Sequence, residues 1–489
     1  MIPAFLISCC AIAGFGGVLW YSAILTVARQ TVSVAMAGLN AMLDNALDDD
    51  AKEVAVRRAG FALFGAAFGI AWRFALALAA AYLPLVLADF AGLATVDDVL
   101  ALMLRLDYIV IVSLVLVVAS AAFKRWRAGG AAAEEGTPQQ GTLYSPVDRF
   151  FHLLAFSKPF VLKKASRIED VFVRVPATEA ARQPVFVTSL ARGGTTAVLN
   201  ALHDLPDVAT HTYRDMPFLT APVIWKKLSG RKRSVARRQR AHGDGLAIDL
   251  DSPEAFEEVL WKLFWPGKFA SDRIALWNSQ DRRVDADRFL KRHMTKIIRA
   301  RGKPAETGRY CSKNNANIAR IDYLTEVFPE GRIVVPLRRP ECHAASLLRQ
   351  HRNFLALQSE DDFVQRYMQD IGHFEFGHIH KPLAFAGFDP AGFDPDSGDY
   401  WLAYWIAAFE DVLTHKQACL IVTQDDLRSA PVPTMEKLCA ELGLRTEGID
   451  FKSYFRSSED RADASLFDPD LLARAQALYA ALRAGTAAA

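Results

Sequence analysis

The chain has 489 residues, which is more than one domain of ordinary size, so at least two regions are expected. A formal net charge of +2 supplies no overall field that would indicate nucleic acid or a strongly acidic partner. The six cysteines include no CxxC pair, and Cys9 and Cys10 lie inside an apolar run. This distribution argues against a disulfide framework or a zinc site and favours a reducing compartment.

Apolar residues are concentrated near the N-terminus, where they form three runs. The first, residues 2–28, has no charged residue; the second, residues 59–88, is interrupted by one arginine and one proline; the third, residues 108–123, is the shortest. The first two are long enough to cross a hydrocarbon layer of about 30 Å. A cleaved signal peptide is disfavoured, because no basic segment precedes the first run. Residues 1–125 are therefore predicted to be an all-α membrane region with about three transmembrane helices.

The basic residues around these runs predict an orientation, because short loops rich in lysine and arginine stay on the cytoplasmic side. Four basic residues lie between the first and second runs: Arg29, Lys52, Arg57 and Arg58. Only Arg105 lies between the second and third runs, and three basic residues follow the third run: Lys124, Arg125 and Arg127. We expect an outside N-terminus, three spans and a cytoplasmic remainder, in a multi-pass protein of the cell inner membrane. Arg73, within the second run, marks either an intramembrane functional site or a contact with a neighbouring helix.

The rest of the chain is expected to be a linker and one globular domain. Residues 126–145 are rich in alanine, glycine, glutamate and glutamine, which predicts a flexible linker. Residues 146–489 alternate short β-branched runs with helical patterns, which indicates an α/β fold with a parallel sheet flanked by helices. The expected strands are 184–188, 332–337 and 418–423, and the expected helices are 196–205 and 343–354.

The most informative stretch is residues 184–205, PVFVTSLARGGTTAVLNALHDL. A strand leads into a loop with two glycines, and a helix follows. Glycine lets backbone N–H groups turn inward and a helix N-terminus carries partial positive charge, so this pattern predicts a P-loop-like phosphate cradle. Thr195 and Thr196 are expected to cap the helix and to donate hydroxyl hydrogen bonds to a phosphate. The alternative is an ordinary turn between a strand and a helix.

This loop is not a Walker A motif, which requires GxxxxGK[ST]. The first glycine of that motif is missing, and Thr195 stands where its lysine would be. A P-loop nucleotide kinase or NTPase is therefore disfavoured, although it remains an alternative function. A non-catalytic membrane scaffold that retains the nucleotide site is the other alternative.

At this loop the sequence resembles the PAPS-dependent sulfotransferase family, in its bacterial, membrane-anchored branch; PAPS is 3'-phosphoadenosine 5'-phosphosulfate. The family's loop has the form PRSGTT, and here it reads Ala191-Arg192-Gly193-Gly194-Thr195-Thr196. Ala191 replaces the proline and Gly193 replaces the serine, so one hydroxyl contact is lost. The resemblance implies a sulfotransferase fold in which Arg192, Gly193, Gly194, Thr195 and Thr196 hold the 5'-phosphosulfate.

Two further motifs support the resemblance. RIVVPLRRPECHAASLLRQH has Arg338, Pro340 and Ser346 at the family spacing, which implies that Arg338 and Ser346 bind the 3'-phosphate. An arginine leaving a strand and a serine on the next helix can converge on one phosphate. Cys311-Ser312-Lys313-Asn314-Asn315 resembles the KNP element, which precedes a helix that ends in Phe328-Pro329. By resemblance, Lys313 stabilises the sulfuryl group in transfer, and Asn317 and Arg320 have supporting roles.

The reaction implied is a metal-independent, in-line transfer of a sulfuryl group from PAPS to a hydroxyl acceptor, with PAP as product. Arg192 and Lys313 are the expected catalytic cations. For the base, the resemblance points first to Asp215, a carboxylate beyond the helix and the adjoining turn, and second to His211. Asp215 could instead pair with Arg214 or cap a helix. The acceptor is expected to be a glycan or a lipid-linked molecule near the bilayer, and no nucleic acid is expected.

Three other features have open interpretations. The basic run 226–240 fits either an anionic surface contact or a solvated loop. The segment 400–405, YWLAYW, fits either a core helix or the wall of an acceptor pocket. His373, His378 and His380 cluster near phenylalanines, and a metal site there is disfavoured.

Overall fold

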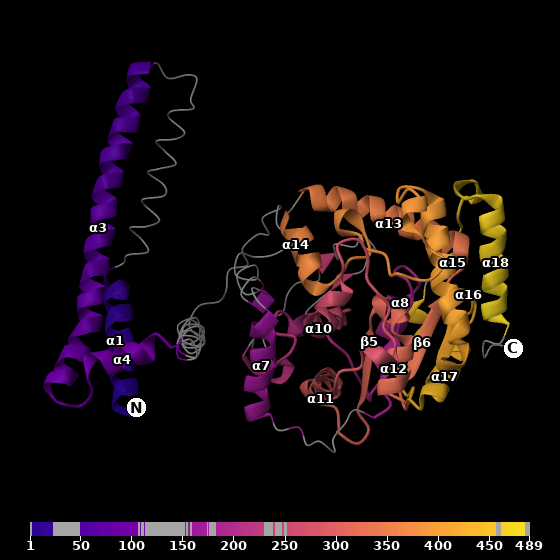
Figure 1. The fold of residues 1–489 in the computed structure, drawn as a ribbon, viewed down its shortest axis with the longest axis horizontal. Coiled ribbons are helices and arrows are strands. Elements are labelled where there is room, and N and C mark those ends of the chain that lie inside the picture. Colours follow the sequence, from indigo (N-terminus) through magenta and orange to yellow (C-terminus); the bar gives the residue numbers. More distant parts are fainter. Residues whose placement is uncertain are drawn as a thin grey trace. The chain divides into compact units, whose positions relative to one another are not determined.

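The computed structural model divides the chain into two compact units, Met1–Thr137 and Pro138–Ala489, each of which is described by itself (Figure 1). The described residues are 2–22, 49–105, 108, 112, 152, 155–156, 159–173, 175, 182–228, 238–239, 247–248, 252–360, 362–455 and 461–484. The predicted linker 126–145 and almost all of the third apolar run, 108–123, lie outside the described residues.

The N-terminal unit contains helices α1 (Ile2–Tyr21), α3 (Asp49–Phe90) and α4 (Val96–Met103). A Cβ added to Gly14 of α1 would lie 2.9 Å from the carbonyl oxygen of Ala80, so the two long helices approach closely at this glycine. Within the described residues, one helical stretch, Gly65–Phe90, is long and apolar enough to cross a membrane by length and composition. The apolar helical stretch Pro3–Leu19 is shorter.

Arg73 of α3 makes backbone contacts. Its Nε donates to the carbonyl oxygen of Ser22 at 3.0 Å, and its Nη1 donates to that of Gly69 at 2.9 Å. Ser22 directly follows α1, so the guanidinium joins the two helices. These bonds support the helix-contact interpretation of Arg73, because they satisfy partly buried donors that would otherwise be costly in an apolar setting.

The C-terminal unit is built on the predicted parallel sheet, which is confirmed. Its five strands have the order β2-β5-β1-β6-β7, and every pairing is parallel. Their bounds are β1 (Val185–Val187), β2 (Val208–Ala209), β5 (Arg309–Lys313), β6 (Arg332–Leu337) and β7 (Cys419–Thr423). The predicted strand 332–337 agrees with β6, the predicted strand 184–188 is one residue longer than β1 at each end, and the predicted strand 418–423 begins one residue before β7. A separate antiparallel pair joins β3 (Arg238–Gln239) to β4 (Ala247–Ile248).

Helices cover both faces of the sheet (Figure 1). They are α7 (Pro159–Phe172), α8 (Thr195–His203), α9 (Pro222–Leu228), α10 (Glu258–Phe264), α11 (Val284–Ala300), α12 (Ile321–Val327), α13 (Pro340–Glu360), α14 (Asp362–Ile371), α15 (Gly398–Thr414), α16 (Gln424–Ser429), α17 (Pro431–Leu442) and α18 (Pro469–Arg483). Both predicted helices are present, but α13 extends beyond the expected 343–354 at both ends. At its start the extension includes Pro340, because proline fits the first turn of a helix.

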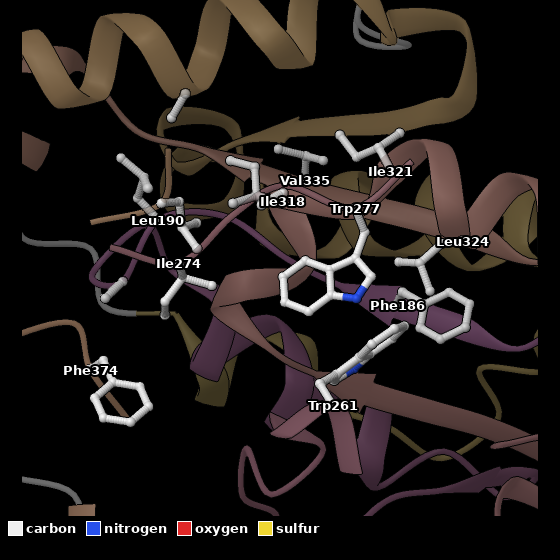
Figure 2. Packing of buried hydrophobic residues seen from close by; sticks show 14 of the residues in the cluster. Phe186, Leu190, Trp261, Ile274, Trp277, Ile318, Ile321, Leu324, Val335 and Phe374 are labelled. Atoms are coloured by element: carbon white, nitrogen blue, oxygen red, sulfur yellow. The ribbon is translucent and has the colours of Figure 1, made fainter. Parts of the chain in front are cut away.

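Alternate side chains of the strands enter two separate cores. Phe186 belongs to the larger core, with helices α10 to α13 and α15, whereas Val185 and Val187 belong to a smaller one with α8 and α17. Such burial on both faces is characteristic of a parallel sheet. Figure 2 shows the indole rings of Trp261 and Trp277 close together in the larger core, with ring centroids 5.9 Å apart.

The central position of β1 locates the site. The strands that flank β1 are β5 and β6. The chain therefore places β2 and β5 on one side of β1, and β6 and β7 on the other side. In open parallel sheets, ligands bind at the carboxyl ends of the strands where the strand order reverses. The loop that follows β1 lies at that point.

Candidate active site

The loop between β1 and α8 has a shape that requires glycine at two positions. Gly194 has a φ of 101°, and a Cβ there would lie 2.6 Å from Nε2 of Gln424. A Cβ at Gly193 would lie 2.5 Å from the hydroxyl oxygen of Ser189. Any larger side chain would therefore displace a neighbour, and at Gly194 it would also strain the backbone. The two glycines therefore let the backbone of the predicted phosphate cradle pass close to the side chains of Ser189 and Gln424.

Helix α8 begins without a side-chain cap. Its N-cap residue is Gly194, and the hydroxyl of Thr195 donates instead to Oδ1 of Asn315 at 3.3 Å. The expectation that Thr195 or Thr196 caps this helix is therefore wrong, because the cap position falls one residue earlier, on a glycine. The first N–H groups of an α-helix have no partner within the helix, so they are available to an anion in the cradle.

Arg192 of this loop contacts both residues expected at the 3'-phosphate. It has a φ of 69°, and its carbonyl oxygen accepts a hydrogen bond from Nη1 of Arg338 at 3.0 Å. Its Nε donates to Oγ of Ser346 at 3.4 Å. Arg338 directly follows β6 and Ser346 lies on α13, and both are buried. Arg338 and Ser346, which lie far from the phosphate loop in the sequence, thus converge on it in the fold.

His343 holds the loop against the core and was not identified from the sequence. Its Nε2 lies 2.8 Å from the carbonyl oxygen of Ala191, and its Nδ1 lies 3.1 Å from Nε1 of Trp405. Because an indole N–H only donates and a carbonyl only accepts, His343 carries its proton on Nε2. The side chain is fully buried, so this neutral histidine joins the phosphate loop to helix α15.

Lys313 lies at the carboxyl end of β5, in register with Val187 of β1. Its Nζ is 3.9 Å from Oε1 of Glu254, and the hydroxyl of Tyr213 donates to the other oxygen of that carboxyl. Both ionisable side chains are buried, with 8% of the lysine and 3% of the glutamate side chain exposed. The expected catalytic lysine therefore has a carboxylate partner that sequence reasoning missed.

A buried polar network fixes the segment after Lys313. Nδ2 of Asn314 donates to Glu258 at 2.7 Å, and Arg320 donates to both oxygens of the same carboxyl. The guanidinium of Arg320 lies between the rings of Trp261 and Trp277, at 4.4 and 4.0 Å from their centroids. Arg320 is fully buried, so this pairing offsets the cost of removing its charge from water. The supporting role expected for Arg320 is consistent with these contacts.

Asp215 lies in a second buried cluster. One carboxylate oxygen accepts the amide of Thr212 at 3.0 Å, pairs with Arg301, and lies 3.5 Å from Nδ1 of His211. Burial alone would raise the pKa of Asp215, but Arg301 and His211 together hold this pKa below its ordinary value. Only 1% of the Asp215 side chain is exposed, so the geometry favours a structural role in which its ion pair with Arg301 holds this turn against the end of α11.

His211, the second expected base, is stacked on His293 in the same cluster. The Nε2 atoms of the two rings lie 3.2 Å apart, so one ring donates a hydrogen bond to the other. Burial lowers the pKa of His293 well below its usual value, which keeps that ring neutral. His211 is 2% exposed, so a proton from an acceptor would have to pass through packed side chains to reach it.

Unpartnered polar atoms around the cradle fit the expected donor. Among the described residues beside the loop, the hydroxyl of Ser189 and the amide oxygen of Gln424 are buried without a hydrogen-bond partner. Buried polar groups normally have a partner, so these atoms indicate a ligand that supplies one. The hydroxyl of Ser189 can donate to a phosphate oxygen, and Gln424 already lies against Gly194. The residues present therefore fit a phosphate-bearing donor.

The remaining sequence features have separate environments. His373, His378 and His380 contact Ala255, Ser359 and Tyr400 respectively, and no metal-binding cluster occurs among the described residues. Most of the basic run 226–240 lies outside the described residues; Lys226, at the end of α9, donates to the carbonyl of Ala300. The segment 400–405 lies on α15, within the larger core.

Comparison with known proteins assigns the family. A model of the sulfotransferase family matches residues 184–448, which is more than half of the chain and includes the loop, Lys313, Arg338 and Ser346. The chain therefore belongs to the sulfotransferase family. No curated protein sequence matches it.

Three solved structures are similar to the chain. A sulfotransferase from Alicyclobacillus acidocaldarius is 13% identical, with 62% of this chain and 95% of that chain covered and a TM-score of 0.31. Sulfotransferase STF9 from Mycobacterium avium is 12% identical, with 70% and 79% covered and a TM-score of 0.35. Sulfotransferase STF1 from Mycobacterium tuberculosis is 12% identical, with 69% and 88% covered and a TM-score of 0.37.

Proposed function

We propose that this sulfotransferase uses PAPS as donor and transfers the sulfuryl group to a hydroxyl acceptor, a glycan or a lipid-linked molecule. The observation that carries the proposal is the convergence of Arg338 and Ser346 on Arg192, beside the glycine cradle. One anionic group is expected in the cradle and a second near Arg338. A donor with phosphate at both its 3' and 5' positions matches that arrangement.

In this proposal each residue has a distinct task. The donor supplies the activated sulfuryl group. The amides at the start of α8 and the guanidinium of Arg192 bind its 5' side and stabilise the charge that spreads during transfer. Lys313 supports the same charge from β5, and Arg338 and Ser346 hold the 3'-phosphate. No metal is proposed, because fixed cations and backbone dipoles can meet these requirements.

In this proposal the proton acceptor is a different group from the residues that bind the donor. Asp215 and His211 remain the candidates that the family resemblance implies. Their burial and mutual contacts favour a bracing role. The carboxylates that lie nearer to the expected site are Glu254, beside Lys313, and Glu375, which is bonded to Asn315.

The donor proposal is tested by the thermal midpoint of the full-length protein in detergent, with PAP or with ATP and magnesium. A ligand that binds only the folded state stabilises it by about 2.7 kcal/mol at one hundred times its Kd. We expect PAP to raise the midpoint and Arg338→Ala to abolish the rise. Arg349→Ala, an exposed arginine on α13, is the matched control.

Two results would redirect the proposal. A rise with ATP and magnesium but none with PAP would favour a nucleotide kinase or NTPase. Retained PAP binding, with no turnover of any hydroxyl acceptor, would favour the non-catalytic scaffold.

We further propose that residues 1–125 anchor the protein in the cell inner membrane as a multi-pass region, with residues 146–489 in the cytoplasm. Supporting observations are the apolar stretch Gly65–Phe90 and the exposed side chains of Phe68, Trp72 and Phe90 on α3. Large exposed apolar side chains on one helix require a covering phase or partner. The distribution of lysine and arginine around the apolar runs supports the proposed orientation, in which residues 146–489 lie in the cytoplasm.

Protease accessibility tests this topology. In intact spheroplasts the C-terminal domain should resist added protease, and in inverted membrane vesicles it should be degraded. The reverse pattern would mean that an even number of spans precedes the domain, and release into the soluble fraction would exclude the anchor.

A further inference from the structure

A pocket adjoins the phosphate loop on the side of the larger core. The space between its walls is about 550 Å³ when the solvent at its open mouth is included, and these walls come from the loop, the turn after Lys313, helix α13, the segment after α14 and helix α15. Leu190 and Ala191 form the wall shared with the loop. In Figure 2, Leu190 and Ile274 lie next to each other at one end of the core, with Phe374 beyond them, and all three line this pocket or its rim.

Asn315 connects the pocket to the phosphate loop. Its Oδ1 accepts the hydroxyl of Thr195 at 3.3 Å, and its Nδ2 donates to Oε1 of Glu375 at 3.0 Å. Thr195 is the first residue of α8, so one amide side chain separates the carboxyl of Glu375 from the start of that helix. A hydroxyl group bound by Glu375 in the pocket would therefore lie toward the phosphate loop.

The walls are mostly apolar. Six side chains supply this surface: Leu190, Ile274, Leu347, Phe374, Leu383 and Trp401. The polar lining residues Glu258, Asn314 and Asn315 are already hydrogen-bonded within the protein, and a sugar hydroxyl buried without a partner is costly. The composition fits a ligand whose body is apolar and whose polar contacts are few.

The charged groups of the pocket balance one another. Glu375 and Lys381 carry opposite formal charges, and Glu258 is paired with Arg320. Burial lowers the pKa of His380 to about 3, so its ring is neutral at ordinary pH. The pocket therefore has no net charge that would select an anionic or cationic ligand.

We infer that this pocket is the acceptor site, that it takes a neutral alcohol or phenol on an apolar body, and that Glu375 binds the reacting hydroxyl and accepts its proton. The inference rests on the proposed sulfotransferase function and narrows the acceptor from a free glycan to an apolar molecule. The bond from sulfur to the acceptor oxygen forms as the bond from sulfur to the 5'-phosphate oxygen breaks. The electron pair leaves with PAP, and the hydroxyl proton moves to the Glu375 carboxylate.

The test uses the full-length protein in detergent with PAPS and two probe acceptors, 2-naphthol and methyl β-D-glucopyranoside. We expect 2-naphthol to be sulfated with a kcat/KM at least tenfold higher. Glu375→Gln keeps the oxygen that accepts from Asn315 but removes the base, so kcat should fall by about 10²-fold or more while PAP still raises the thermal midpoint.

A second variant tests the pocket itself. Ala316→Leu fills space at its wall and should raise the KM for 2-naphthol at least tenfold with an unchanged PAP response. Ala440→Leu, exposed on α17, is the matched control and should behave as wild type.

The outcomes separate this inference from the donor proposal. Preferential sulfation of the glucoside, or failure of 2-naphthol both to react and to shift the midpoint of the PAP-bound protein, would overturn the acceptor assignment. Wild-type kcat in Glu375→Gln would remove Glu375 from the reaction. Absence of any PAP response in the wild type would instead count against the donor site.

Discussion

The guanidinium Nε of Arg192 donates a hydrogen bond to the hydroxyl of Ser346 at 3.4 Å, which joins the phosphate loop to helix α13. Arg338 donates to the carbonyl of the same arginine at 3.0 Å. Two arginines thus lie in one hydrogen-bonded cluster at the carboxyl end of the sheet. Like charges in a partly buried site repel, and an anion bound between them relieves that repulsion.

A double-mutant cycle on Arg192 and Ser346 should show that they act on one ligand. Arg192→Gln and Ser346→Ala are each expected to weaken PAP binding about tenfold, or about 1.4 kcal/mol. The double variant should lose less than the sum, because residues in one hydrogen-bonded cluster are coupled. Calorimetric titration with PAP measures all three affinities. Ser359→Ala, exposed on the same helix, is the control, and strict additivity would contradict the shared site.

Gly194→Ala should lower the stability of the loop by about 1–3 kcal/mol, because alanine is strained at positive φ. The added Cβ also meets Gln424, so Gln424→Ala in the same chain should restore part of the loss. Gly387 also has a positive φ but open space around it, so Gly387→Ala isolates the backbone strain. Thermal midpoints compare the variants. Equal losses for the two glycine variants would show that the Gln424 contact is unimportant.

Lys313→Ala should lower kcat by about 10²–10³-fold and change PAP affinity only a few-fold. A cation directed at charge that develops during transfer contributes to the rate more than to ground-state binding. Steady-state kinetics and PAP titration separate the two effects, with Lys437→Ala, exposed on α17, as the control. A loss of PAP affinity equal to the loss in kcat would assign Lys313 to donor binding alone.

Glu254→Gln should lower kcat about tenfold with little change in KM, because Glu254 positions the ammonium of Lys313. The effect should disappear when Lys313 is already alanine, since a positioning residue acts through its partner. Kinetics of the single and double variants measure this dependence. A further loss of activity in the Lys313→Ala background would show that Glu254 acts directly.

Asp215→Asn should destabilise the protein by about 3 kcal/mol at pH 7, because Arg301 would lose its buried partner. The folded-state pKa of Asp215 is lowered, so its contribution is complete above the unfolded value of about 3.9 and is lost as pH falls through the lower folded value. The gap in thermal midpoint should therefore be constant from pH 7 to 5 and shrink below about pH 4.

An exposed aspartate provides the comparison for Asp215. Asp396→Asn removes a surface ion pair with Arg352 and should change the midpoint little at any pH. A collapse of kcat in Asp215→Asn at an unchanged midpoint would instead identify Asp215 as the base.

Local pattern was sufficient to predict which residues come together at the carboxyl edge of the sheet. The two glycines, Lys313, Arg338 and Ser346 follow strands directly or lie on the next helix. Because parallel strands bring their carboxyl ends to one edge, residues at such positions converge whatever the intervening chain does. The helix cap was predicted one residue late. Threonine is a preferred N-cap residue, but Gly194 occupies the N-cap of α8, and this preference alone does not locate the start of the helix.

The carboxylates and the packing around them were decided by tertiary structure. Glu254 contacts Lys313, Glu375 contacts Asn315 and His343 contacts Ala191. The partners in each pair are far apart in the sequence, so no spacing pattern predicts these contacts. Asp215 was selected from the sequence as a base, yet its surroundings are Arg301 and His211 in a nearly closed interior. The chemistry of a carboxylate depends on burial and on the charges around it, and both arise only when distant segments pack together.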